Sequence, residues 1–171
     1  MIKLLPMRSF VLAGAVLIAC LIVVSHTCAA DQSTLPTITG AGIQSLVAKN
    51  KGKVVLLHFW ATWCPPCAEE FPALVQVYTA YKTRGLEVIA VSLNDVSEMQ
   101  DVMRFVHAQK PSFPLYIAGT VKETFYRSID KRWSSGVPLT LMYDKTGTLR
   151  YFHDGARTYA QFDRDVQSLL Q

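Results

Sequence analysis

The segment HFWATWCPPCAEEFP places two cysteines, Cys64 and Cys67, two residues apart. Such a pair can form a structural disulfide, supply half of a metal site or exchange electrons with another dithiol. A disulfide across two residues closes almost no loop, so it would add little to the stability of the fold. A structural zinc site takes four ligands, and His58, His107 and His153 are scattered along the chain. The spacing therefore favours redox chemistry and predicts no metal site.

The neighbouring elements must place Cys64 where it can react. Residues 54–60 form an apolar run that only His58 interrupts, which is typical of a strand buried on both faces. A helix follows, with Cys67 in its first turn and apolar residues at helical spacing to about Arg84. Cys64 thus stands beside the unpaired N–H groups and the positive dipole end of a helix, which favour its thiolate. We expect Cys64 to attack a partner's disulfide and Cys67, which is less exposed, to resolve the mixed disulfide.

Strands and helices alternate along the rest of the chain, which predicts an α/β fold with a mixed sheet. Asp144-Lys145-Thr146-Gly147 has the composition of a hairpin turn between two apolar runs. The segment Lys131-Arg132-Trp133 is expected to be a solvated loop, with contact to a substrate as the alternative. Apolar spacing predicts the remaining elements: a short helix ending near residue 50, strands over 86–93, 113–117, 139–143 and 149–152, and helices over 96–109, 121–129 and about 162–170.

The N-terminus has the pattern of an export signal. Lys3 and Arg8 form a positive stretch, residues 10–24 are apolar and uncharged, and small residues precede a cleavage point near Ala30. This apolar run is shorter than the roughly 20 residues of a comfortable membrane span. Two alternatives to cleavage stay open. The run is retained as a membrane anchor, or a lipobox ends at Cys20 and that cysteine is lipidated.

The chain therefore divides into a signal or anchor, residues 1–30, and a single domain, residues 31–171. Two of the four cysteines, Cys20 and Cys28, fall in the first segment, so the domain has one pair, whereas a disulfide-dependent secreted fold would show several. The domain carries 15 Lys and Arg against 13 Asp and Glu, which is too balanced to predict a nucleic-acid partner. Each fate of the signal places the domain outside the cytoplasmic membrane, in a bacterial periplasm.

The motif Phe59-Trp60-Ala61-x-Trp63-Cys64-x-Pro66-Cys67 resembles the active site of the thioredoxin superfamily. Three further features make the chain similar to the exported TlpA/ResA-like thiol-disulfide oxidoreductases: Gly52-Lys53-Val54, Glu70-Phe71-Pro72, and an added helix and strand across residues 94–120. The resemblance implies a thioredoxin fold, with a mixed central sheet flanked by helices and the insertion around residues 94–120. It implies no cofactor other than the redox-active disulfide of Cys64 and Cys67.

The resemblance also implies a cis-proline loop opposite the cysteines, and Gly136-Val137-Pro138 is the matching segment. The main chain of Val137 would pair with an extended substrate segment. Pro138 can neither donate a hydrogen bond nor ligate a metal tightly, so it would leave the dithiol free to react. The alternative is an ordinary turn before a strand. Trp63 is expected to shield the disulfide, with a plain packing role as its alternative.

Two titratable residues are expected beside the pair. Glu70 matches the family's carboxylate and follows Cys67 by three residues, so it lies on the same side of the helix. Burial would raise its pKa and suit it to exchange a proton with a buried thiol, whereas a solvated first-turn acid is the alternative and describes Glu69 better. His58 stands where thioredoxins carry an acid below the disulfide. It is either a base near neutral pH or a hydrogen-bonded core residue.

The residues around Cys64 also predict the direction of electron transfer. Pro65 and Pro66 lack the N–H groups that would stabilise a thiolate, and Glu69 and Glu70 add negative charge nearby. Both effects weaken the stabilisation of the reduced form and favour a reductant.

We therefore expect a protein-disulfide reductase. By resemblance, a membrane electron-donor protein would recharge it, and its protein substrates would be disulfides such as those of apocytochrome c or of copper-site cysteines. Two other functions stay open: a disulfide oxidase or isomerase, and a copper metallochaperone or binding module of the same fold.

Overall fold

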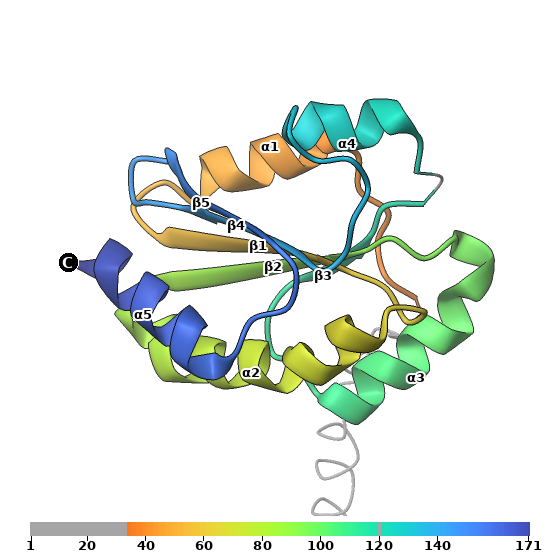
Figure 1. The fold of residues 1–171 in the computed structure, drawn as a ribbon, viewed down its shortest axis with the longest axis horizontal. Coiled ribbons are helices and arrows are strands. Elements are labelled where there is room, and N and C mark those ends of the chain that lie inside the picture. Colours follow the sequence, from red (N-terminus) through yellow and green to blue (C-terminus); the bar gives the residue numbers. More distant parts are fainter. Residues whose placement is uncertain (1–33, 120) are drawn as a thin grey trace, which may run out of the picture. The chain divides into compact units, whose positions relative to one another are not determined.

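A five-stranded mixed sheet forms the centre of the domain in the computed structural model, which describes residues 34–119 and 121–171 (Figure 1). The predicted signal or anchor, residues 1–30, lies outside the described residues. β1, β2 and β3 are parallel, β4 is antiparallel to β1, and β5 is antiparallel to β4. The spatial order is β3-β2-β1-β4-β5, and the bounds are β1 (Val54–Trp60), β2 (Leu86–Ser92), β3 (Leu115–Ile117), β4 (Leu139–Tyr143) and β5 (Leu149–Asp154).

Helices cover both faces of this sheet (Figure 1). One face carries α1 (Gly40–Lys49) and α4 (Glu123–Ile129), and the other carries α2 (Pro65–Tyr81), α3 (Met99–Gln109) and α5 (Tyr159–Leu170). A short 3-10 turn, η1 (Lys82–Arg84), directly follows α2, and a second, η2 (Val96–Glu98), directly precedes α3. The predicted mixed sheet flanked by helices is confirmed, and α3 and β3 occupy the segment in which the sequence predicts an added helix and strand.

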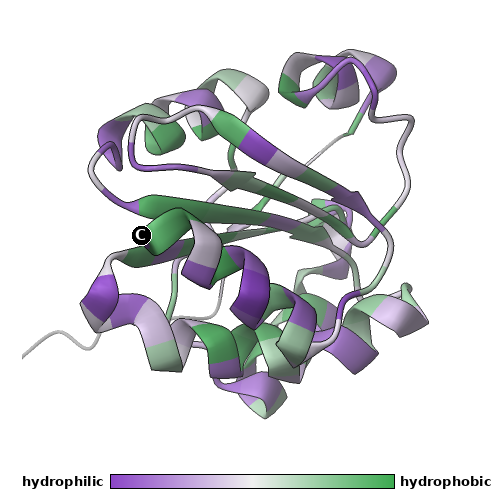
Figure 2. Ribbon diagram, turned by 60° about the vertical axis from the view of Figure 1, so that its left-hand side comes forward, coloured by the Kyte–Doolittle hydropathy of each residue, from purple (hydrophilic) through white to green (hydrophobic). Residues whose placement is uncertain are grey.

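β1 is buried along its whole length because it is the central strand of a sheet covered on both faces. Successive side chains of a strand point to opposite faces. Leu56 and Trp60 belong to the core cluster with α2 and α5, whereas Leu57 and Phe59 belong to the cluster with α1. His58 therefore enters the α2 side of the sheet. In Figure 2 the central strands are hydrophobic, and the helices mix hydrophobic with hydrophilic residues.

Several element boundaries differ from the prediction by one to three residues, and two of them are those of the third strand and of the helix after it. The third strand begins at Leu115 and not at Phe113, because Pro114 has no N–H to donate to the ladder and restricts the residue before it. Phe113 is buried against the core instead. The helix after this strand begins at Glu123, two residues later than expected.

The prediction of a solvated loop is wrong for Trp133. Its side chain is buried, and its ring packs on Phe59 with the ring centroids 4.4 Å apart. Its Nε1 donates a hydrogen bond to the carbonyl oxygen of Gly136 (2.7 Å), so the ring has an apolar body in the core and a satisfied polar edge. Lys131 and Arg132 are exposed, as expected. Trp133 thus fastens the following loop to the core.

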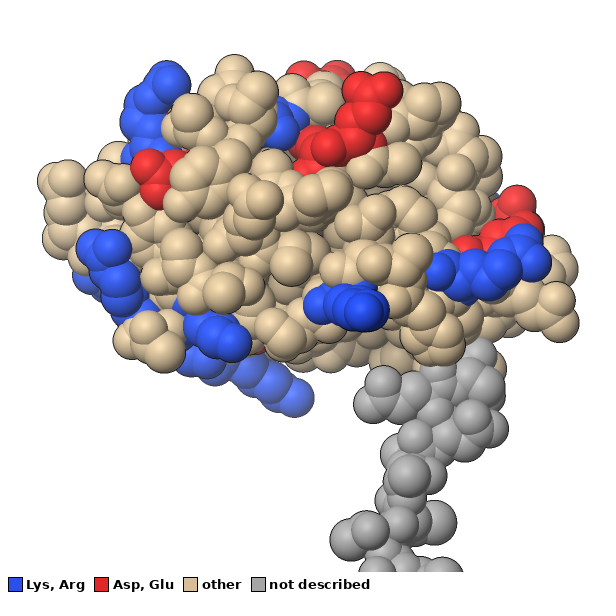
Figure 3. All heavy atoms as spheres, turned by 90° about the horizontal axis from the view of Figure 1, so that it is seen from below, with Lys and Arg blue, Asp and Glu red and all other residues tan. Residues whose placement is uncertain are grey.

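Charged side chains are dispersed over the face that Figure 3 shows, which α2, α3 and α5 cover. Lysine and arginine side chains lie in separate places there, divided by uncharged and acidic residues. On this face the described residues form no continuous basic stripe of the kind that follows a nucleic-acid backbone. Among residues 34–119 and 121–171, no helix is long and apolar enough to cross a bilayer.

Candidate redox active site

The two cysteines form a disulfide at the start of α2. Cys64 and Cys67 are joined by an S–S bond of 2.07 Å, with their Cα atoms 5.3 Å apart. Cys64 is the N-cap residue of α2, and its Sγ accepts a hydrogen bond from the N–H of Cys67 (3.2 Å). Cys64 is 4% exposed and Cys67 is 0% exposed, so Cys64 is the more accessible sulfur. The structure thus brings the pair together at the helix end, with the expected difference in exposure.

Two prolines limit how well α2 can stabilise a thiolate at Cys64. Pro65 and Pro66 occupy the first two positions of the helix and have no N–H. Cys67 is therefore the first residue of α2 whose main chain can donate to Cys64 Sγ. Cys64 has the favourable position of a helix N-cap but few donors, which leaves its thiolate less stabilised than at a helix without prolines.

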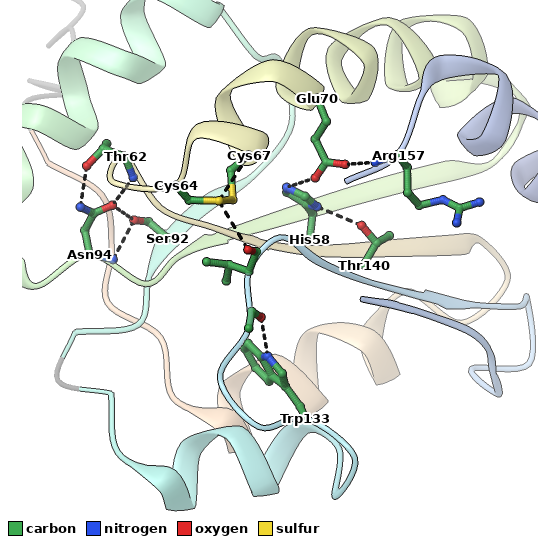
Figure 4. The surroundings of a disulfide bond; sticks show 12 residues. His58, Thr62, Cys64, Cys67, Glu70, Ser92, Asn94, Trp133, Thr140 and Arg157 are labelled. Carbon is green, nitrogen blue, oxygen red and sulfur yellow. Dashed lines mark hydrogen bonds and ion pairs between the residues drawn. A yellow bond between two sulfur atoms is a disulfide. The ribbon is translucent and has the colours of Figure 1, made fainter. Parts of the chain in front are cut away.

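The predicted cis-proline loop faces the disulfide (Figure 4). The peptide bond between Val137 and Pro138 is cis, and the carbonyl oxygen of Val137 lies 3.5 Å from Cys64 Sγ. Pro138 is buried and Val137 is half-buried. The hydrogen bond between Trp133 and Gly136 holds the same loop from the other side. The cis bond is confirmed, and the segment is not an ordinary turn.

Trp63 lies directly before Cys64 and is 57% exposed, the largest exposed fraction among the big hydrophobic side chains of the described residues. Shielding of the disulfide by Trp63 and a plain packing role of this side chain both stay predictions. An exposed indole beside a reactive sulfur is available for contact with another protein.

Glu70 is buried one helical turn beyond Cys67 and is only 3% exposed. Its Oε2 accepts a hydrogen bond from the main-chain N–H of Arg157 (2.6 Å), and its Oε1 lies 3.3 Å from His58 Nε2. Burial raises the pKa of the Glu70 carboxyl from its ordinary 4.5 to about 7, although the N–H and the charge of Arg157 oppose the rise. The alternative of a solvated acid is therefore wrong for Glu70, whereas its neighbour Glu69 is exposed.

His58 lies beside Glu70, on the α2 side of β1 (Figure 4). Its Nδ1 is 3.0 Å from Thr140 Oγ1, and its ring is fully buried. Burial lowers the pKa of His58 to about 3, so the imidazole is neutral near neutral pH. The contact with Glu70 is thus not an ion pair at that pH, and His58 does not titrate there as the expectation of a base requires. The group of this pair that titrates near neutral pH is Glu70.

Sequence reasoning missed a second set of polar residues that holds the loop before Cys64. Asn94 is fully buried just after β2, and its side chain forms two hydrogen bonds with Thr62: Asn94 Nδ2 donates to Oγ1 (2.7 Å), and Asn94 Oδ1 accepts from the main-chain N–H (2.9 Å). Ser92 Oγ also donates to Asn94 Oδ1 (2.9 Å). The signal was present, because the carboxyl ends of parallel strands lie at the same edge of a sheet and polar residues follow both β1 and β2.

Replacing Asn94 with alanine is expected to loosen this loop. Half-buried Thr62 would lose two hydrogen bonds, which at about 0.5–1.5 kcal/mol each costs about 1–3 kcal/mol of unfolding free energy. We expect faster hydrogen exchange at the Thr62 amide, measured by NMR on the oxidised protein. The matched control is Asn50→Ala, which removes a side-chain hydrogen bond to Leu46 at the end of α1. Unchanged protection of Thr62 in the Asn94 variant would contradict the assignment.

No group of three or more His, Cys, Asp or Glu side chains within the described residues is arranged to hold a metal ion. The residues that surround the disulfide are a glutamate, a neutral imidazole, hydroxyl groups and main-chain groups. This set matches thiol chemistry with proton transfer.

Comparison with known proteins gives this site relatives with named activities. The chain is 35% identical over 108 residues to the thiol-disulfide oxidoreductase ResA of Halalkalibacterium halodurans. The matched residues cover 63% of this chain and 57% of that protein. It is 34% identical over 121 residues to ResA of Bacillus subtilis, which covers 71% of this chain and 63% of the relative. The chain thus spans about three fifths of the length of these two relatives.

Solved structures share the fold. A thiol:disulfide interchange protein of the thioredoxin family from Chlorobium tepidum matches with a TM-score of 0.64 at 26% identity, covering 81% of this chain and 97% of that one. StoA from Bacillus subtilis matches with a TM-score of 0.54 at 27% identity, and the match covers 68% of this chain and 84% of the StoA chain. These matches confirm the predicted thioredoxin fold and the resemblance to ResA-like proteins. The pattern of the AhpC/TSA family matches residues 28–152, and the chain therefore belongs to that family.

Proposed function

We propose that the protein is a thiol-disulfide oxidoreductase that reduces disulfides of other proteins outside the cytoplasmic membrane. The observation that carries the proposal is the position of Cys64, the more accessible sulfur of the pair, at the N-cap of α2 and facing the carbonyl oxygen of Val137. The name of the relatives called thiol-disulfide oxidoreductase ResA supports the same class of reaction.

The reaction proceeds by two thiol–disulfide exchanges. In the reduced protein, the Cys64 thiolate attacks one sulfur of the client disulfide, forms a mixed disulfide and releases the first client thiolate. Cys67 then loses its proton and attacks Cys64 Sγ. This step forms the Cys64–Cys67 disulfide and releases the second client thiolate. The client gains two electrons, and the protein gives up two.

Glu70 is the proposed acceptor of the Cys67 proton. It follows Cys67 by one helical turn, and a pKa of about 7 lets its carboxyl both accept and return a proton near neutral pH. His58 acts through Glu70 as a positioning residue, since its neutral ring lies 3.3 Å from Oε1 and is itself held by Thr140. The proton passes from the Cys67 thiol to the carboxylate, and reduction of the disulfide returns it.

Client binding is proposed on the surface around Cys64. An extended client segment would pair with the main chain of Val137, next to Pro138, as strands pair at the edge of a sheet. Trp63 would cover the apolar side of that segment, because its indole is exposed beside the disulfide. Phe59 and Trp133 keep the facing loop in place from below.

The direction is proposed to be reduction. The Cys64 sulfur has a single main-chain donor in α2, and the two carboxylates of Glu69 and Glu70 disfavour further negative charge nearby. Less stabilisation of the thiolate raises the free energy of the reduced form and makes the dithiol a better electron donor.

The proposed cellular setting is the periplasm, with the domain free after cleavage or tethered through its N-terminus. The export pattern of residues 1–30 supports this proposal. A membrane electron-donor protein would restore the dithiol. Haem-attachment cysteines of apocytochrome c or copper-site cysteines are the proposed clients, and no cofactor other than the disulfide is needed.

A trapping experiment tests the proposal. With Cys67→Ala the resolving sulfur is gone, so clients should remain joined to Cys64 when the full chain is expressed in the bacterial envelope. Non-reducing gels and mass spectrometry should then identify proteins with paired cysteines, and the Cys64→Ala/Cys67→Ala variant should capture none. Tight copper(I) binding by the unaltered protein without reduction of insulin would instead favour the metallochaperone.

A further inference from the structure

Polar groups from the far end of the chain meet the buried carboxyl of Glu70. Arg157 lies in the loop between β5 and α5, and its main-chain N–H donates to Glu70 Oε2 (2.6 Å). Its side chain leads away from Glu70 (Figure 4), and the guanidinium donates to Asp165 Oδ2 on α5 (2.5 Å). The same oxygen of Asp165 lies 3.0 Å from His153 Nε2. A connected set of polar groups thus runs from Glu70 to α5.

The ion pair between Arg157 and Asp165 is largely removed from water. The two side chains are 13% and 11% exposed. A buried carboxylate requires a cation or several hydrogen-bond donors, since desolvation otherwise disfavours its charge. Arg157 meets this requirement for Asp165, and Asp165 in turn fixes the guanidinium. The guanidinium and the N–H that donates to Glu70 belong to one residue, so holding the guanidinium on Asp165 limits how far the main chain of Arg157 can move from Glu70.

Groups on several elements face Glu70, and they act in opposite directions. His58 of β1 contacts Oε1, and its neutral ring adds no charge near neutral pH. Burial raises the pKa of Glu70, and both the N–H and the charge of Arg157 lower it. Beyond Arg157 lie Asp165 of α5 and His153 of β5. Burial and the charge of Arg157 lower the pKa of His153, although Asp165 opposes them. Arg157 is thus the group that draws Glu70 toward its ionised form.

We infer that Arg157 and Asp165 are positioning residues for Glu70: Asp165 anchors the guanidinium of Arg157, and Arg157 thereby keeps its main-chain N–H at the carboxyl. The inference rests on the proposed role of Glu70 as the acceptor of the Cys67 proton. It adds that the strength of this acceptor is set from the loop before α5 and from α5 itself. Without the anchor, Glu70 keeps its proton to higher pH, and Cys67 lacks an acceptor at neutral pH.

Titration of the Glu70 carboxyl tests the inference directly. The side-chain carboxyl carbon is followed by NMR against pH in the oxidised full chain, where neither cysteine titrates. Arg157→Gln and Asp165→Asn are each expected to raise the titration midpoint of Glu70, and in Asp165→Asn the loss of the anchor must outweigh the opposite effect of removing the negative charge of Asp165. Arg157→Lys keeps a cation that can pair with Asp165 and should return the midpoint toward that of the unaltered protein. Asp163→Asn is the matched control on α5, because Asp163 forms hydrogen bonds with Tyr81 and Gln167 and not with Arg157. In this variant the titration midpoint of Glu70 should not move.

A midpoint that stays or falls in both Arg157→Gln and Asp165→Asn would overturn the inference. If Asp165→Asn does not fold, the comparison of Arg157→Gln with Arg157→Lys decides the question. Rescue by lysine supports a role through the ion pair with Asp165, whereas equal midpoints in these two variants contradict it.

A kinetic readout separates this inference from the proposed function. The reduced protein reacts with 5,5′-dithiobis(2-nitrobenzoate), which releases one thionitrobenzoate on attack by Cys64 and a second when Cys67 resolves the mixed disulfide. In Asp165→Asn the second phase should slow at least about threefold at pH 7 and recover at higher pH. The reason is that a higher pKa lowers the fraction of Glu70 that is ionised at pH 7 and can accept the proton of Cys67. A midpoint that moves without any change in this phase would support the positioning pair and reject Glu70 as the acceptor.

Discussion

Reduction of insulin disulfides by the protein is expected to fall about a thousandfold or more when Cys64 is replaced by serine, because a serine hydroxyl is not a nucleophile toward disulfides at neutral pH. Replacing Cys67 with serine should have a different result. Cys64 keeps its place at the N-cap of α2 and still attacks, so one mixed disulfide forms and turnover stops. The measurements are the rate of insulin precipitation and the mass of the adduct.

Both variants should unfold cooperatively at temperatures close to that of the reduced unaltered protein, which serves as the control for folding. If Cys67→Ser formed no adduct while Cys64→Ser formed one, the roles of nucleophile and resolving cysteine would be reversed. Full insulin reduction by Cys64→Ser would reject the site altogether.

Glu70→Gln is expected to make the protein more stable at alkaline pH. The pKa of Glu70 is about 7 in the folded protein and 4.5 as its ordinary value, so the folded state binds this proton more tightly than the unfolded state. The resulting stability is fully present below pH 4.5 and is lost as the pH rises through 7. The loss is about 3 kcal/mol at 1.36 kcal/mol per pKa unit. Glutamine cannot ionise, and its amide oxygen can still accept from the N–H of Arg157.

Urea unfolding of the oxidised proteins at pH 4 and pH 8 measures this effect. Glu70→Gln and the unaltered protein should have similar free energies of unfolding at pH 4, and the variant should be more stable at pH 8. His58 has the opposite dependence, because its lowered pKa gives stability above pH 6.5 that is lost as the pH falls, so only the difference between the two proteins isolates Glu70. The exposed neighbour variant, Glu69→Gln, should show no such gain. A Glu70 variant that is less stable at pH 8 would refute the raised pKa.

The same substitution should slow the chemistry. Without a carboxylate near Cys67, resolution of the mixed disulfide is expected to slow about a hundredfold at pH 7, which is within the usual contribution of a general base. Attack by Cys64 on 5,5′-dithiobis(2-nitrobenzoate) should change much less, because Glu70 lies beyond Cys67 on the interior side. Gain in stability and loss of rate in one variant would show that the buried acid is retained for its chemistry.

The sequence predicts the parts of this site that depend on neighbours along the chain. The strand before Cys64, the helix after it and the place of Glu70 one turn beyond Cys67 follow from apolar spacing and from the helix start. The cis bond before Pro138 came from family resemblance, and the structure confirms it. The strand, the helix and the place of Glu70 are local features, so neighbouring residues along the chain specify them.

The features that escaped prediction are long-range contacts. The pKa of His58 depends on burial of the whole ring and on Thr140, which a strand pairing brings beside it. Arg157 reaches Glu70 through a main-chain N–H, for which no side-chain pattern exists. Trp133 is buried although two charged residues precede it, because its ring packs on Phe59. Predicting such contacts requires knowing which distant segments of the chain lie side by side in the fold, and no local sequence pattern gives this.

The reduction potential of the Cys64–Cys67 couple tests the central claim most directly. The oxidised protein is equilibrated with glutathione and dithiothreitol buffers of defined potential, and free thiols are then alkylated and counted. We expect one reversible two-electron transition with a midpoint nearer to about −270 mV, as in thioredoxin, than to about −120 mV, as in a strong periplasmic oxidant. A dithiol that persists in buffers as oxidising as the periplasm, or a disulfide that no buffer reduces, would contradict it.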